Sequence, residues 1–496
     1  MKKIALFIKR YLFILVLCLS QGLLARTFVH PGGIHSMDDL NRMKAKVAAK
    51  EHPWIDAWNL LITDPQAQST WTASPYTNIG GNIIRQAAAR DARAAYLNIL
   101  RWYITGSVAN ADCAVRICNA WSASINQVAN GELYQLPIST FMQAAELLRM
   151  YPGWAKADQE NFKNMALTYF YQPCHDFLSF CDAHSSWSAP ALYSIMGIAV
   201  FCDDSTTYDE AANYFKTGAY SGCIMKGIMQ PSGQLGEMAR DQPHAAIGPA
   251  AWSHICQVAW NQGDTSLFSY GNNRLLAGYE YFCKANLNHP VEWIPYTDCS
   301  YRWYYMSLSG LCNLNKATPE FELIYNHYAV LKGIPAPYTH KMANLTRISQ
   351  GDYFGYGTLT FTLDGADSPY PPYPIPAAPA NLTATPGASR IYLHWTPPDG
   401  DVATGYNVWR SASADGPFTN LATLSDYTGG NYADKTAAPG TTYYYAVSAI
   451  NQSGAGAKSS VAGAQSIAAS ATLPIGWARN DIGSYTVAGT ASYANV

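Results

Sequence analysis

The spacing of apolar residues divides this chain of 496 residues into two kinds of sequence. From about residue 30 to 347, apolar residues recur at helical spacing in segments separated by Gly, Pro and Asn. The segment 190–201 is apolar on nearly every side, as a helix surrounded by other helices would be. We expect more than ten helices here, forming a closed or nearly closed array of helical hairpins with a cleft lined by helix ends. The clearest predicted helices are 38–49, 87–105, 113–128, 140–151, 190–201 and 321–331.

Beyond residue 350 the pattern changes to that of strands and spacers. Residues 351–363 alternate and predict a strand that closes the helical domain. Six prolines between Pro369 and Pro379 predict a semi-rigid spacer, on the order of 30 Å long if extended. The expected domains are therefore a leader at 1–25, a helical domain at 26–365, a linker at 366–379, a β-domain at 380–470 and a further segment at 471–496.

The β-domain resembles a fibronectin type III module. It contains NLTATPGASRIYLHW, GYNVWRS and PGTTYYYAVSAIN in the order of an immunoglobulin-like sandwich, with Trp395, Tyr406 and the run 443–445 at the expected places. We expect the Tyr run to form core and a tyrosine corner rather than a sugar-binding face. Residues 471–496 read as the first strands of another β-domain, too short to bury a core alone, so we expect a longer natural chain.

The N-terminus has the pattern of an export signal. Lys2, Lys3, Lys9 and Arg10 precede an apolar run, and the small Ala25 offers a cleavage point. A secreted or periplasmic protein is expected. Cys18 would allow a lipid anchor, but the Leu that precedes it is not the small residue that such processing needs. No other stretch has the length and apolarity of a membrane span.

Composition favours a sugar ligand over nucleic acid or anionic lipid. Charged residues make up only 13% of the chain and the formal net charge is −2, so no basic surface is indicated. The 35 Tyr and 14 Trp residues could stack on sugar rings, although most are expected in the core. Ten cysteines lie between Cys113 and Cys312, an even number compatible with disulfides. Local pairs such as 113 with 118, or 174 with 181, are possible by spacing, but the connectivity stays open.

The segment 231–263 carries the densest group of polar residues. Glu237, Arg240, Asp241, Gln242 and His244 precede or open an apolar helix, with a proline suited to its first turn and Asp241 or Gln242 as cap. A first-turn His lies at the positive end of the helix dipole, so its imidazole tends to stay neutral and able to accept a proton, while the exposed amides attract an anion. A buried capping cluster is the competing interpretation.

Several ordered motifs together resemble bacterial polysaccharide lyases of the alginate-lyase superfamily. They are HPGGIHSMDDLNRMKAKVAAKEHPW, LRWYITG, ICNAWS, AAELLRMY, IAVFCDD, GEMARDQPHAAIG and QVAWNQG, spread over about 320 residues. The resemblance implies an (α/α) toroid or incomplete barrel. It also implies that the protein cleaves a uronic-acid polymer such as alginate by β-elimination, with an acidic polysaccharide as its partner and no cofactor or metal.

β-Elimination requires a neutralised uronate carboxylate, a base for the carbon-5 proton and an acid for the leaving oxygen. His244 matches the family His in RDQPH and is the expected base, or the acid for the other epimer. The partner tyrosine is Tyr296 or Tyr301, ranked equally; Arg302 beside the latter would favour its phenolate. Arg240 could hold the carboxylate or simply pair with Glu237, three residues away.

One position departs from the family pattern. Many relatives carry Asn before a Trp ahead of the apolar helix, whereas this chain has Ser186 before Trp187 and His184 two residues earlier. We therefore expect carboxylate binding to fall to His184, Gln242 or Arg240. We also expect Glu237, Ser186 and Arg302 to line the substrate-binding site. Trp187 could stack on a sugar or lie in the core.

Two other functions are compatible with the sequence. An inverting glycoside hydrolase on the same helical scaffold would need two carboxylates, which Glu237 and Asp241 would supply. A non-catalytic glycan-binding protein is the other alternative. The uronate epimer, endo or exo action and the oligomeric state stay open.

Overall fold

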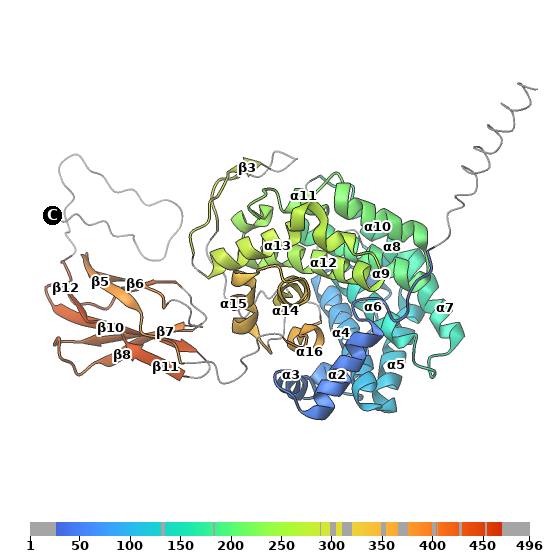
Figure 1. Ribbon diagram of the computed structural model, residues 1–496, viewed down its shortest axis with the longest axis horizontal. Coiled ribbons are helices and arrows are strands. Elements are labelled where there is room, and N and C mark those ends of the chain that lie inside the picture. The colour runs from blue at the N-terminus through green and yellow to red at the C-terminus, as the bar shows by residue number, and fades with distance from the viewer. Residues whose placement is uncertain are drawn as a thin grey trace, which may run out of the picture.

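The computed structural model describes residues 26–129, 134–181, 184–287, 289–297, 304–309, 320–348, 354–365, 375–398, 403, 405–425, 429–451 and 454–468. Its described parts form a helical N-terminal region and a C-terminal β-sandwich (Figure 1). Several predictions concern residues outside this described part and stay predictions. They are those for the export signal, most of the proline-rich spacer, Tyr301, Arg302 and residues 471–496.

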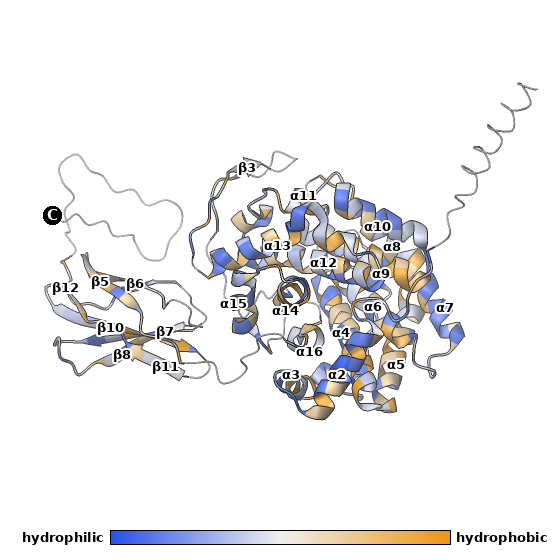
Figure 2. Ribbon diagram, in the orientation of Figure 1, coloured by the Kyte–Doolittle hydropathy of each residue, from blue (hydrophilic) through white to orange (hydrophobic). Residues whose placement is uncertain are grey.

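Four long helices form the inner layer of the helical region. α6 and α9 are buried along almost their whole length. The inner helices α4, α9 and α12 each pack against the outer helix that follows them, which makes helical hairpins. After α6, the next outer helices pack on its neighbours, α7 on α5 and α8 on α9. This arrangement confirms the predicted (α/α) toroid, and Figure 2 shows hydrophilic residues on the outer helices α7 and α10. The inner helices are α4 (Asn82–Thr105), α6 (Gln135–Leu148), α9 (Ser185–Cys202) and α12 (Gln242–Asn261); the outer ones are α5 (Val108–Ser124), α7 (Lys156–Met165), α8 (Tyr171–Phe177), α10 (Ser205–Thr217) and α13 (Ser266–Asn286).

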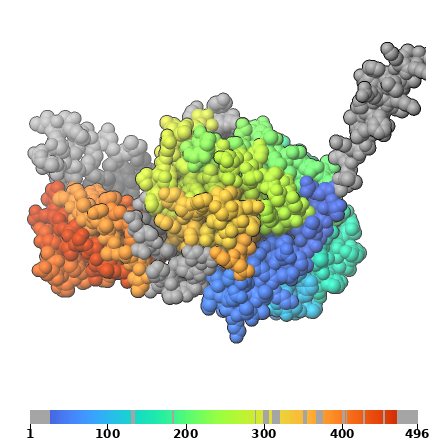
Figure 3. All heavy atoms as spheres, in the orientation of Figure 1, coloured from blue at the N-terminus to red at the C-terminus, as the bar shows by residue number. Residues whose placement is uncertain are grey.

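The first and last helices of this region close the ring. Arg42 donates to the Thr360 carbonyl at 2.7 Å, and the Trp54 indole donates to the Thr362 carbonyl at 3.1 Å. Figure 3 shows the first helices, in blue, against the last ones, in gold. The helices at this seam are α2 (Met37–Ala49), α3 (Trp54–Leu61), α14 (Phe321–Tyr325), α15 (Pro337–Thr346) and α16 (Gly357–Phe361).

The strand predicted at 351–363 is wrong. The described part of this segment forms α16, and the apolar side chains of Phe354, Tyr356, Leu359 and Phe361 are buried in the helical core. They pack against helices instead of a sheet. The short alternation of apolar and polar residues therefore did not indicate a strand here.

The core helix α9 is unusually apolar. It is the one described helix that is long and apolar enough to cross a membrane. Its residues are almost all buried inside the protein, as expected for a core helix packed between α6 and α12.

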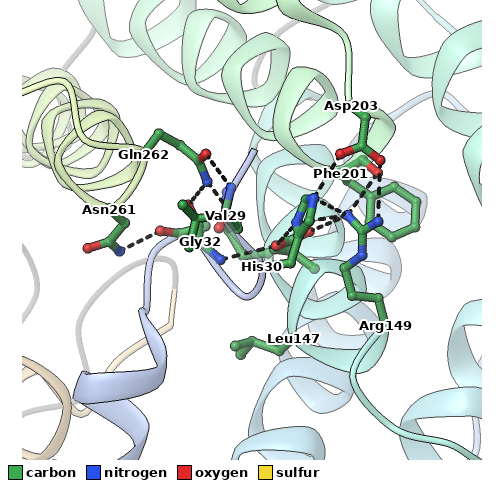
Figure 4. Close-up of polar contacts among 12 residues, drawn as sticks. Val29, His30, Gly32, Leu147, Arg149, Phe201, Asp203, Asn261 and Gln262 are labelled. Atoms are coloured by element: carbon green, nitrogen blue, oxygen red, sulfur yellow. Dashed lines mark hydrogen bonds and ion pairs between the residues drawn. The ribbon is translucent and has the colours of Figure 1, made fainter. Parts of the chain in front are cut away.

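The inner helices all begin at the same end of the ring. The short strands β1 (Asn78–Ile79) and β2 (Gln127–Val128), which precede α4 and α6, pair in parallel. At the opposite end, the segment 29–33 joins the last turns of α6, α9 and α12 (Figure 4). Sites at the two ends are therefore built from different halves of the same helices.

The contacts in Figure 4 centre on His30. Its Nδ1 lies 2.7 Å from Glu146 Oε1, and its Nε2 lies 2.8 Å from Asp203 Oδ1. Arg149 pairs with both carboxylates, at 3.2 and 3.3 Å. The Gln262 amide at the end of α12 accepts from the Val29 backbone at 3.0 Å. Three helix ends are thus held by one short segment.

The β-sandwich confirms the predicted inward aromatic residues. Trp395 and Tyr406 are fully buried with ring centroids 5.1 Å apart. The Tyr445 hydroxyl donates to Asp434 at 2.8 Å inside the domain. One sheet contains β5 (Ala380–Gly387), β6 (Arg390–Thr396) and β9 (Asn431–Asp434); the other contains β7 (Gly405–Ser411), β8 (Thr419–Ser425), β10 (Thr442–Asn451), β11 (Gly454–Lys458) and β12 (Ala462–Gln465).

The local disulfides allowed by spacing do not form. Cys113, Cys118 and Cys174 are buried free thiols, whereas Cys181 is disulfide-bonded. Cys113 and Cys118 lie on the same helix, α5, which keeps both in helical geometry and packed in the core.

We predict that His30 stabilises the helical region in a pH-dependent way. Burial alone would lower the pKa of His30, but Glu146 and Asp203 outweigh burial and raise this pKa above 6.5. The charged form is therefore favoured by folding, so the contribution is fully present below pH 6.5 and is lost as the pH rises through the raised pKa. Replacing His30→Gln should cost about 1–3 kcal/mol of unfolding free energy at pH 6 and clearly less at pH 9.

Urea unfolding followed by helical circular dichroism measures this difference. Burial would raise the pKa of Asp203, but His30 and Arg149 lower it below 3.8, so Asp203 stays ionised across this pH range. An equal cost of His30→Gln at both pH values would contradict the prediction.

Candidate active site

The starts of α9 and α12 are joined by the buried carboxylate of Glu237. Glu237 lies in η3 (Gly236–Ala239), the short turn just before α12. Its Oε2 accepts from Ser185 Oγ and from the Ser186 backbone N–H, both at 2.7 Å, and its Oε1 accepts from Ser186 Oγ at 2.8 Å. The side chain is only 4% exposed, so Glu237 makes its contacts with other protein groups and not with solvent.

Glu237 takes the place of a missing helix cap. The N-cap residue of α9 is His184, whose side chain makes no capping hydrogen bond. The first N–H groups of a helix need acceptors, and a negative charge there is favoured by the helix dipole. Glu237 meets both needs from a segment about 50 residues away in the sequence.

Asp241 caps α12 and holds the ring of His244. Its Oδ1 accepts from the His244 backbone N–H at 2.8 Å, and its two oxygens lie 2.8 and 2.7 Å from His244 Nδ1. Burial alone would raise the pKa of Asp241, but the hydrogen bonds and charge of His244, with Arg240, lower it below 3.8. The ionised carboxylate therefore orients the imidazole as well as the helix.

The neighbours of His244 fix its tautomer. Nδ1 faces a carboxylate, which can only accept, so Nδ1 carries the hydrogen. Nε2 lies 3.2 Å from Arg240 Nη2, which can only donate, so Nε2 presents its lone pair. This is the form of imidazole that can accept a proton.

Arg240 lies between three of these groups. Its Nη1 is 3.6 Å from Glu237 Oε1, and its Nε is 3.7 Å from Asp241 Oδ2. Its side chain and those of Asp241 and His244 are each about one third exposed, at 31, 38 and 32%. Arg240 thus pairs with Glu237, one of the two alternatives weighed for it, and also reaches solvent, whereas its contact with a substrate carboxylate stays a prediction.

A second imidazole, that of His184, also approaches Glu237 Oε1. His184 Nδ1 is 4.0 Å from Glu237 Oε1, and the side chain is 13% exposed. The ring of Trp187 meets that of His184 edge to face, with centroids 5.7 Å apart, and also contacts Phe177. Trp187 is therefore half-buried and packed against these two rings.

Two residues expected to bind substrate lie inside the protein. Gln242 is fully buried; its amide donates to the Met238 carbonyl and to Ser309 Oγ, and its oxygen accepts from Asn286. Ser186 is also fully buried and bonded to Glu237. Both side chains are engaged in contacts inside the protein, which corrects the expectation that they contact substrate. The same correction applies to Glu237, which is buried and bonded to α9.

Tyr296 is brought to the same turn as Glu237. It lies in β3 (Tyr296–Thr297), which pairs with β4 (Tyr304–Tyr305), and its hydroxyl donates to the Gly236 carbonyl. Tyr301 and Arg302 lie outside the described residues, so the choice between the two tyrosines stays a prediction.

The role of Ser185 was not predicted from the sequence. An added Cβ at Gly248 of α12 would lie only 2.9 Å from Ser185 Oγ, so the close approach of the two helices depends on this glycine. A Gly inside an apolar helical pattern was the available signal for such an approach.

We predict that Glu237→Gln destabilises the helical region. A glutamine amide would direct a donor at Ser185, Ser186 or Arg240 where the carboxylate accepts, and it would remove the charge at the start of α9. The expected cost is about 2–4 kcal/mol of unfolding free energy. Urea unfolding measures it, with Glu160→Gln, at an exposed position of α7, as the matched control. Equal stability of the two variants would refute this role of Glu237.

Known proteins resemble the two parts of the chain separately. Residues 377–464 match the model of the fibronectin type III domain. An amylopullulanase of Thermoanaerobacterium saccharolyticum is 33% identical over 124 residues, which cover 25% of this chain and 9% of that protein. One of Thermoanaerobacter thermohydrosulfuricus is 40% identical over 79 residues, covering 16% and 5%. The chain thus spans less than a tenth of the length of these relatives.

Among solved structures, an Fn3-like protein from Clostridium thermocellum is 38% identical, with 18% of this chain and 93% of that chain covered and a TM-score of 0.17. The family model of alginate lyase matches residues 43–293, half of the chain, and includes α4 to α13 with the cluster around Glu237. By this match, the chain belongs to the alginate lyase family.

Proposed function

We propose that the helical domain cleaves alginate or a related polyuronate by β-elimination. The observation that carries the proposal is the pairing of a proton-accepting imidazole, His244, with an arginine, Arg240, at the starts of two inner helices. Family membership supports a polysaccharide lyase. The chemistry of the cluster supports an acidic substrate, because the partly exposed Arg240 guanidinium can bind a carboxylate.

In this proposal His244 removes the carbon-5 proton. Asp241 fixes the ring and stabilises the imidazolium that forms, as a carboxylate behind a histidine does in general base catalysis. Nε2 is the atom that accepts the proton. In the free protein this atom is occupied by the hydrogen bond from Arg240.

Substrate binding would release that hydrogen bond. A uronate carboxylate is a stronger acceptor for a guanidinium than a neutral imidazole, and it can take two parallel hydrogen bonds. If Arg240 turned to the uronate carboxylate, it would neutralise the charge of that carboxylate. The same movement would leave His244 Nε2 free to accept a proton. Carboxylate neutralisation and base activation would then depend on one residue.

Two groups are available to protonate the leaving oxygen. The Tyr296 hydroxyl donates to the carbonyl of Gly236, the residue before Glu237, and the His184 imidazole lies 4.0 Å from Glu237 Oε1. We propose Tyr296 as the acid, with Tyr301 as the alternative, and His184 as a carboxylate-binding group. Trp187 would then offer its free edge to a sugar ring.

The position of the carboxylates disfavours the hydrolase alternative. Glycoside hydrolysis needs two carboxyl groups free to face the bond. Glu237 is buried with its oxygens bonded to α9, and Asp241 is bonded to the His244 ring. Neither is arranged as a free acid or base.

We further propose that the protein is exported and that the fibronectin type III domain acts as a spacer. The basic and apolar N-terminal sequence supports export. The fully packed aromatic core of the sandwich supports a spacer role.

The direct test is an absorbance assay for unsaturated products. Polymannuronate, polyguluronate, glucuronan and a glycosaminoglycan are incubated with the wild-type protein and with His244→Ala. We expect ultraviolet absorbance to grow on at least one polymer and the rate to fall by about 10²–10⁴-fold in the variant. His52→Ala is the matched control, because His52 lies just before α3 with an exposed side chain that pairs with Asp56 at 2.6 Å.

Full activity of His244→Ala would refute the assignment of the base. Glycan binding by the wild-type protein without absorbance on any polymer would favour the non-catalytic alternative.

We predict that Arg240→Lys impairs both binding and turnover. Lysine keeps the charge but cannot make two parallel hydrogen bonds to a carboxylate. KM should rise and kcat should fall, with kcat/KM lower by about 10²-fold or more. Steady-state kinetics measure both constants, with Arg390→Lys in the sandwich as the control. A change in neither constant would show that Arg240 only pairs with Glu237.

A further inference from the structure

A polar hollow lies on the outer layer of the toroid, between α5, α7 and the turn η2 (Ala166–Phe170). Its volume is ≈ 510 Å³, within the range of about 300–1,000 Å³ typical of ligand sites. None of its lining residues belongs to the cluster around Glu237 and His244. The hollow is therefore a separate feature from the candidate active site.

Two helix faces of small polar residues form the walls. Asn161, Asn164 and Thr168 follow one another at helical spacing along α7 and η2. Asn119 and Ser122 do the same on α5 across the hollow. Side chains three, four or seven positions apart share a helix face, so each wall presents its polar groups in one direction.

One wall is fixed and the other is available. Asn119 donates to Asp158 at 2.7 Å and accepts from the Trp154 indole at 3.0 Å. Asn161 and Asn164, in contrast, are exposed and make no side-chain hydrogen bond among the residues that the structure describes. Rigid groups on one side and unused amides on the other suit a ligand that both donates and accepts hydrogen bonds.

The backbone at one end of the hollow is irregular. η2 is a π-helical segment of five residues between two α-helices, and its Thr168 and Tyr169 line the hollow. Single π-turns inside helices are rare and occur often at functional sites. Tyr169 adds a partly buried aromatic ring to a lining of amides and hydroxyls, one carboxylate and the apolar Ala123 and Met165.

From this lining we infer that the hollow binds a neutral oligosaccharide segment. Carboxamides and hydroxyls each donate and accept, as sugar hydroxyls do, and Tyr169 offers a ring for the apolar face of a sugar. The lining contains one carboxylate, Asp158, and no Lys, Arg or His. A uronate would meet a like charge there with no cation to neutralise it. The site thus differs in ligand class from the proposed active site.

Calorimetric titration of the full chain tests the inference. The probes are maltohexaose, cellohexaose and mannohexaose, with a mannuronate hexamer as the acidic comparator. The variants are Asn161→Leu with Asn164→Leu, which removes two amides, and Ala123→Trp, which fills the hollow from α5. Asn213→Leu on exposed α10 is the matched control.

We expect at least one neutral hexamer to bind, with roughly tenfold or greater loss of affinity in both variants and no loss in the control. The affinity for the mannuronate hexamer should stay unchanged in all of them. Absence of binding by every neutral hexamer would overturn the inference, as would neutral binding that the variants leave intact or a variant-dependent loss of the acidic hexamer alone. The neutral hexamers carry no uronate to eliminate, so their binding is independent of the proposed lyase activity. The mannuronate hexamer is titrated in the His244→Ala background, so that no turnover contributes to its heat.

Discussion

The carboxylate of Glu237 is the contact on which the arrangement of the site depends. It caps α9 from a turn that precedes α12, and so it fixes the distance between two inner helices at their first residues. Arg240 and His184 are both positioned around its Oε1. A charge this deeply buried is stable only with several donors. The helix start, two serine hydroxyls and a guanidinium supply them.

The two ends of the ring have different roles. At the starts of α9 and α12, partly exposed groups surround a proton-accepting imidazole. At the far ends of α6, α9 and α12, the segment 29–33 connects the helices. His30 in this segment bonds to α6 and α9, and Gln262 at the end of α12 bonds to the segment. The apolar inner helices separate the two ends. The residues that stabilise one end therefore do not contact the groups at the other end.

The sequence was a good guide where the signal was local. Helical spacing located the inner helices, Asp241 and Pro243 marked the start of α12, and the order of Trp395 and Tyr406 identified the sandwich. The polar cluster was also recognised, because its members are adjacent in the chain. Each of these features is set by residues within one or two helical turns or strands.

It failed where a role depends on distant segments. Ser186 and Gln242 look available to a ligand until Glu237, Ser309 and Asn286 are seen to occupy them. The alternating residues near Phe354 face helices that are far away in the sequence, so they form α16 and no strand. Burial of a polar group is decided by which segment packs on it, and no local spacing encodes that partner.

The most direct test of the central claim is the mass of the product released from a polyuronate. Elimination breaks the glycosidic bond without adding water, so one new fragment end is unsaturated and the summed mass of the fragments equals that of the polymer cut. We predict that wild-type protein acting in ¹⁸O-water releases oligouronates that lack one water and carry no ¹⁸O from the cleavage. Saturated fragments, each cleavage having added one labelled water, would contradict the account and identify a hydrolase.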